Sequence, residues 1–146
     1  MLLGHAGSRY RGLVRDRPTV LTVLAALAGL QGAALLVYAA FDIVQALRVG
    51  ITGPEEVSNA GALISLIVII AAFGAALVWV AWGWWRARSW ARAPFVVAQL
   101  ILAFIGYEVS QSGEATLRTV GQVAMLVAVV GVILVFLPST RRALSD

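Results

Sequence analysis

The sequence predicts an all-α integral membrane protein, a four-helix bundle with antiparallel neighbours and both termini in the cytoplasm. Of its 146 residues 61% are hydrophobic and only 12% are charged, whereas a soluble domain carries about 25% charged residues. Apolar runs long enough to cross a bilayer alternate with short polar segments, and arginines gather at the ends of these runs. We therefore expect a multi-pass protein of the cell membrane, in contact with the lipid bilayer.

The segment WVAWGWWRARSWARAP, residues 79–94, holds all five tryptophans and three of the arginines. Tryptophan suits the membrane interface, where its ring stays in hydrocarbon and its N–H reaches water, and arginine beside an apolar run marks the cytoplasmic side. A tryptophan-rich core turn of a soluble protein is the alternative, but the flanking apolar runs are too long for it. We expect a tight turn at the inner surface, with these side chains as anchors: Trp79, Trp82, Trp84, Trp85, Trp90, Arg86, Arg88 and Arg92.

A basic tail, residues 1–18, precedes the first apolar run, which spans about 19–47. This run is too long for the apolar core of a signal peptide, so it predicts an uncleaved first span. Its polar residues fall on one stripe of a helix, which we expect to face other helices because polar groups are costly in lipid. The members of this stripe are Gln31, Tyr38, Asp42 and Gln45.

Three more spans are expected at about 58–85, 93–109 and 116–137, which gives a transmembrane domain over 19–138 and a basic cytoplasmic tail over 139–146. A loop with Gly53 and Pro54 separates the first two, and SQSGEA, residues 110–115, separates the last two. A stripe of small residues in the second span predicts a close-packing face: Gly61, Ser65, Ala72, Ala76 and Gly83. In the third span Gln99 shares a stripe with Gly106, and Glu108 lies on the opposite face.

The arginine distribution predicts the orientation of the four spans. The N-terminal tail, the Trp-rich turn and the C-terminal tail together carry nine arginines, whereas the opposite side carries only Arg48 and Arg118. By the positive-inside rule both termini are then cytoplasmic.

The layout of a basic tail, a long first span, a Trp-rich turn and a short third span resembles uncharacterised small four-helix integral membrane proteins of high-GC Gram-positive bacteria. Residues 88–100, RSWARAPFVVAQL, carry the resemblance in sequence. It implies the four-helix fold and no activity.

Several kinds of chemistry have no residues to support them. The chain has no cysteine and a single histidine, His5, which lies in the N-terminal tail. We found no nucleophile–base arrangement and no phosphate-binding loop, so we expect no enzyme activity, no cofactor and no metal. The net charge of +4 does not indicate nucleic acid, because the arginines sit at the ends of apolar runs.

Asp42 and Glu108 are the candidate intramembrane carboxylates, and such a group is by default a hypothesis of a functional site. The alternative is that both lie near water or pair with Arg48 and Arg118. Because a short loop joins the third and fourth spans, we expect Glu108 to pair with Arg118, unless Arg48 of the first span takes the place of Arg118.

These observations favour a non-enzymatic accessory or assembly subunit that packs against another integral membrane protein or forms a homo-oligomer. The alternative is a small oligomeric transporter or channel with a polar path that involves Gln31, Asp42 and Glu108. A membrane enzyme is a third, weaker hypothesis.

Overall fold

The computed structural model describes residues 19–49 and 60–144. The predicted N-terminal tail and most of the predicted loop at 48–57 lie outside the described residues. Six helices make up the described part: α1 (Thr19–Val49), α2 (Ala60–Trp85), the short 3-10 helix η1 (Ser89–Ala91), α3 (Arg92–Ser110), α4 (Ala115–Phe136) and α5 (Pro138–Ala143).

The all-α prediction is confirmed for the described residues, which contain no strand. Four of the helices are long and apolar enough to cross a membrane, and their bounds agree with the predicted spans to within two residues. A helix satisfies its backbone hydrogen bonds within its own segment, so these apolar runs form structures that hydrocarbon tolerates. The structure is therefore compatible with a multi-pass membrane protein.

The four long helices form two antiparallel hairpins, α1 with α2 and α3 with α4, and glycines bring the two helices of each hairpin together. A Cβ placed on Gly32 would lie 2.7 Å from the backbone oxygen of Gly74, and one on Gly121 would lie 2.5 Å from that of Gly106. Only glycine permits such close approach of two helix backbones.

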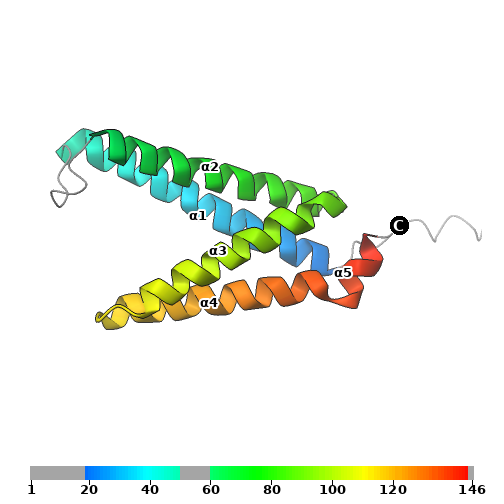
Figure 1. Ribbon diagram of the computed structural model, residues 1–146. Coiled ribbons are helices and arrows are strands. Elements are labelled where there is room, and N and C mark those ends of the chain that lie inside the picture. The colour runs from blue at the N-terminus through cyan, green and yellow to red at the C-terminus, as the bar shows by residue number, and fades with distance from the viewer. Residues whose placement is uncertain (1–18, 50–59, 145–146) are drawn as a thin grey trace, which may run out of the picture.

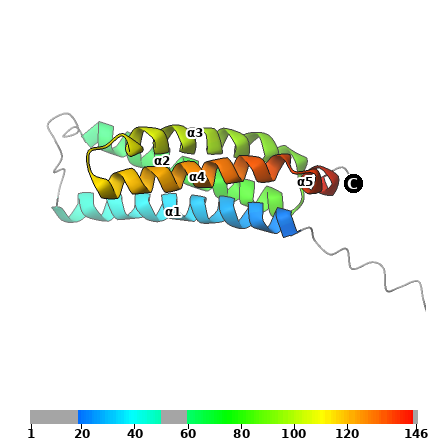
Figure 2. The same ribbon diagram turned by 90° about the horizontal axis from the view of Figure 1, so that it is seen from below.

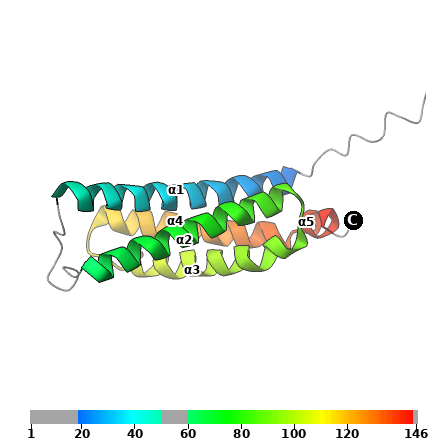
Figure 3. The same ribbon diagram turned by 90° about the horizontal axis from the view of Figure 1, so that it is seen from above.

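The hairpins meet at one end and diverge toward the other, like the two arms of a V (Figure 1). Seen after a quarter turn, from below and from above, α1, α3 and α4 run roughly side by side, whereas α2 crosses them at an angle (Figures 2 and 3). The joined end carries the Trp-rich turn, the start of α1 and α5, whereas the 111–114 connection lies at the diverging end.

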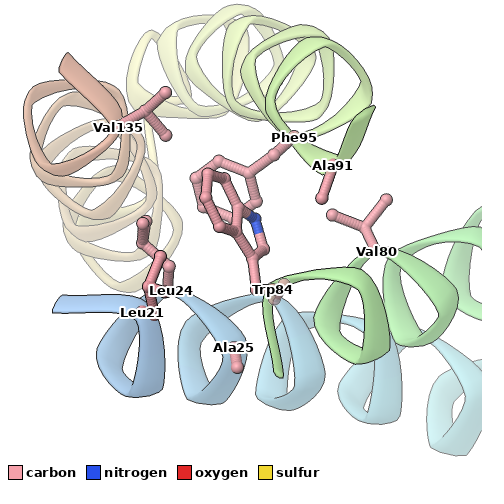
Figure 4. Close-up of a cluster of buried hydrophobic side chains, with 9 residues drawn as sticks. Leu21, Leu24, Ala25, Val80, Trp84, Ala91, Phe95 and Val135 are labelled. Carbon is pink, nitrogen blue, oxygen red and sulfur yellow. The ribbon is translucent and has the colours of Figure 1, made fainter. Parts of the chain in front are cut away.

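All four long helices contribute to a hydrophobic core at the joined end (Figure 4). Trp84 projects from α2 between the hairpins and meets Phe95 of α3 edge to face, with ring centroids 5.8 Å apart. Leu21 and Leu24 of α1 and Val135 of α4 complete the cluster. Burial of these apolar side chains favours the association of the two hairpins. The cluster lies at the joined end, so this contribution acts at that end of the molecule and not at the diverging end.

One expectation about packing is wrong for four of its five residues. In the small-residue stripe of α2, Gly61, Ser65, Ala72 and Ala76 are exposed because the buried face with Gly74 lies on the other side of the helix, and only Gly83 is buried as expected. Within the predicted C-terminal tail, residues 139–143 belong to helix α5, and the next residue, Leu144, packs on the core.

The described charges are divided between the two ends. The arginines of the Trp-rich turn and of α5 lie at the joined end, whereas every described carboxylate (Asp42, Glu108 and Glu114) lies toward the diverging end. This arrangement is what the predicted orientation requires, but the orientation itself stays a prediction.

Candidate functional site

The most specific polar contact between the hairpins is a reciprocal pair of side-chain amides. Gln99 of α3 donates from Nε2 to Oε1 of Gln31 on α1 at 2.9 Å, and Gln31 donates back to Oε1 of Gln99 at 3.4 Å. Gln99 is fully buried, so this pair satisfies amide groups that hydrocarbon would leave without partners.

Helix α4 makes room for this amide pair. A Cβ on Gly131 would lie 3.0 Å from Cδ of Gln99, so a larger residue at 131 would displace the glutamine side chain. The amide pair thus involves three helices: α1 and α3 supply the glutamines, and α4 supplies the glycine beside them. It is a polar contact next to the apolar core, on the side toward the diverging end. The sequence assigned Gln31 and Gln99 to helix faces but did not pair them with each other.

The rest of the α1 polar stripe lies past this point on the same face of the helix. Tyr38 is exposed, Asp42 is partly exposed, and Gln45 is exposed. No described side chain is hydrogen-bonded or ion-paired to Asp42. The prediction that the stripe faces other helices is therefore met at Gln31 and not in the diverging half of α1.

Glu108 and Arg118 do not pair, contrary to expectation. Both side chains are exposed, and no ion pair joins them. The reason is geometric, because α3 meets α4 through Gly106, and Glu108 lies about 200° further around α3 at about 100° per residue. Glu108 also lies opposite Gln99 on α3, which removes it from any path that includes Gln31.

The Trp-rich turn closes α2 with a left-handed residue. Arg88 N–H donates to the Gly83 carbonyl at 2.9 Å and Ala87 N–H to the Trp84 carbonyl at 3.0 Å, with Ala87 at φ 52°. This hydrogen-bond pattern commonly ends a helix, and glycine usually occupies the left-handed position.

Four of the five tryptophans are exposed around this turn, as an interfacial anchor requires: Trp79, Trp82, Trp85 and Trp90. The rings of Trp79 and Trp90 meet edge to face at 6.1 Å, and the Arg86 guanidinium lies 4.4 Å from the ring centroid of Trp82. Trp84 differs, because it is fully buried and forms the centre of the core instead of facing the interface.

The three turn arginines have different surroundings. Arg86 and Arg88 are exposed, whereas Arg92 is half-buried and its Nε and Nη2 atoms are buried without a hydrogen-bond partner. Among the described residues, no three His, Asp or Glu side chains gather where they could hold a metal ion. Comparison of the chain with protein-family models, with curated proteins and with solved structures found no match.

Proposed function

We propose that this protein is a non-enzymatic subunit of a membrane assembly, and that its diverging hairpins receive a helix of another integral membrane protein or of a second copy of this chain. The observation that carries the proposal is that the inner helix faces are buried at the joined end and uncovered at the other.

Pairs of residues five turns apart on one helix make this difference clear, because 18 residues return to about the same side of a helix. Trp84 is 0% exposed and Leu66, 18 residues earlier in α2, is 46% exposed. Val135 is 2% exposed and Leu117, 18 residues earlier in α4, is 44% exposed. On α1 the buried Leu24 has Asp42 as its counterpart, which is partly exposed.

We call the inner surface formed by Tyr38, Asp42, Leu66 and Leu117 the diverging faces. A compact four-helix bundle would bury these positions against one another. By helical spacing, apolar leucines on α2 and α4 and polar groups on α1 continue the helix sides that meet in the core, a mixture that lipid chains match poorly. A helix with an apolar side and a hydrogen-bonding residue opposite Tyr38 or Asp42 would match it well.

The transporter alternative has less support. A continuous polar path would have to pass from Asp42 through Gln31 to the joined end, and there Trp84, Phe95 and Leu24 fill the space between the helices. If an Asp42→Asn variant keeps its stability but loses a proton-dependent flux, the transporter function would be favoured over the subunit role.

Photo-crosslinking from the diverging faces tests the proposal. A photoreactive amino acid at Leu66 or at Leu117 of the tagged full-length chain, irradiated in native membranes, should give a crosslinked protein. A product with twice the mass of the chain identifies a second copy, and any other discrete product identifies the partner. Crosslinks to lipid alone at both positions would contradict the proposal.

Val68 provides the matched control on the same helix. It lies about 200° around α2 from Leu66, at nearly the same depth, and is also exposed. It should crosslink to lipid only. If Val68 crosslinks to protein and Leu66 does not, the partner binds the exposed small-residue stripe of α2. That result would rule out the diverging faces as the binding surface.

A further inference from the structure

A second site lies at the joined end, on the side where α3, α4 and α5 come together. A pocket of about 670 Å³ is lined there by Arg92, Arg141 and five small or apolar residues, among them Val97 and Phe136. It is separate from the diverging faces, and the inference drawn from it does not depend on the proposed partner.

Arg92 supplies an unsatisfied cation to this pocket. Its Nε and Nη2 atoms are buried and lack a hydrogen-bond partner, although a guanidinium carries five N–H donors. No described carboxylate lies at this end of the bundle, because Asp42, Glu108 and Glu114 are all toward the other end. Buried guanidinium nitrogens without an acceptor are costly, so an acceptor from outside the described chain that reached these two atoms would stabilise the half-buried Arg92 side chain.

The turn between α4 and α5 brings a second arginine to the same pocket. Leu137 leaves the helical conformation with ψ 142°, and Pro138 begins α5. Thr140 is fully buried and donates from Oγ1 to the Leu134 carbonyl at 2.7 Å, which holds α5 against the end of α4. Arg141, the next residue, thereby becomes part of the pocket wall.

We propose that this pocket binds a membrane phospholipid with an anionic headgroup. The guanidinium groups of Arg92 and Arg141 would bind the headgroup phosphate through charge-assisted hydrogen bonds, for which arginine is well suited. The first part of an acyl chain would lie along Val97 and Phe136. The site is at the end of the apolar helices beside the exposed tryptophans, which is the depth at which headgroup phosphates lie.

Lipid binding to the purified full-length chain tests the proposal. The protein is placed in nanodiscs of phosphatidylcholine with increasing phosphatidylglycerol, and bound lipid is counted by native mass spectrometry after release into detergent. We expect saturable retention of phosphatidylglycerol over phosphatidylcholine. Arg92→Gln and Arg141→Gln should each weaken it about tenfold, as expected for the loss of one charge-assisted hydrogen bond.

Arg88→Gln is the matched control, because Arg88 is exposed at the same end and does not line the pocket. It should change retention less than about twofold, since a distant surface charge contributes little. If Arg88→Gln and Arg92→Gln lose phosphatidylglycerol retention equally, the retention depends on general surface charge. That result would contradict a specific site in the pocket. Equal retention of phosphatidylcholine and phosphatidylglycerol would overturn the headgroup preference.

Two further measurements keep the proposal falsifiable if Arg92→Gln does not fold. Val97→Trp keeps both arginines and fills the apolar wall, so it should abolish retention of the lipid while the chain stays folded. Inorganic phosphate and glycerol phosphate should not compete with the lipid at equal concentration. Competition by either one, or full retention in Val97→Trp, would show a site for a soluble anion instead of a lipid.

Discussion

Replacement of Gln99 by methionine tests the polar link between the hairpins. Methionine is unbranched and close to glutamine in size, so it can occupy the space beside Gly131 that the Gln99 side chain fills. The substitution removes two hydrogen bonds, one of 2.9 Å and one of 3.4 Å, and leaves the Gln31 amide without its partner.

The magnitude follows from the geometry of the pair. Interhelical hydrogen bonds in membrane proteins average about 0.6 kcal/mol and reach about 1.7 kcal/mol. Because one of these two bonds is long, we expect a coupling of about 1 kcal/mol between Gln31 and Gln99. Leaving one amide unpaired adds a desolvation cost, so Gln99→Met should lower the free energy of unfolding by about 1–3 kcal/mol.

A double-mutant cycle measures this coupling by unfolding in mixed detergent micelles. Gln31→Met and Gln99→Met should each destabilise the protein, and the double variant should lose less than the sum, because replacing both partners leaves no orphaned amide. Gln45→Met is the control, since Gln45 is an exposed glutamine on α1, the helix that carries Gln31. Additive losses in the cycle, or a loss in Gln45→Met equal to that in Gln99→Met, would refute the reasoning.

Three further predictions concern packing and the Trp-rich turn. Gly121→Ala should cost about 1–3 kcal/mol because its Cβ would overlap backbone atoms of α3, whereas Gly113→Ala, with no atom within 4 Å, should have little effect in the same thermal unfolding assay. Trp84→Ala should cost about 3–5 kcal/mol by opening the core, and a similar loss in the exposed Trp82→Ala would show that burial is not the cause. Ala87→Gly should stabilise the protein by up to about 1 kcal/mol by relieving the left-handed conformation, and a lower melting temperature would contradict that interpretation.

The positions of the four long helices could be predicted because they depend on local sequence. A run such as residues 60–85 has no stable conformation in hydrocarbon other than a helix, and the polar residues beyond it end the run. The Trp-rich turn was predictable for the same reason. The burial of Trp84 could not be predicted, because Trp82 and Trp85 are also tryptophans in the same segment. The three differ only in the side of α2 on which they lie, and the sequence does not show which side packs against the other hairpin.

Contacts between helices could not be predicted from periodicity alone. The stripe of polar residues on α1 was predicted to face other helices, and it does so at Gln31 only. A stripe gives a direction around one helix and does not identify the helix that it meets. For α2 the small-residue stripe, apart from Gly83, points away from the packed face, since the bulkier face with Leu77 and Trp84 buries more apolar surface against the neighbours. Glu108 and Arg118 are close along the chain, but their directions around α3 and α4 keep them from pairing.

The divergence of the hairpins is the basis of the proposed subunit role, and a distance measurement in lipid tests it most directly. The chain has no cysteine, so spin labels on Leu66→Cys and Leu117→Cys report only from α2 and α4. In a compact bundle these positions would meet at the centre, with neighbouring helix axes about 8–10 Å apart. Pulsed electron paramagnetic resonance of the labelled protein in nanodiscs should instead give a distance between the two spin labels well above that of packed helices. This distance should persist when the crosslinked partner or a second copy is present. A short separation typical of packed helices would mean that the hairpins close on each other, and the account would then be wrong.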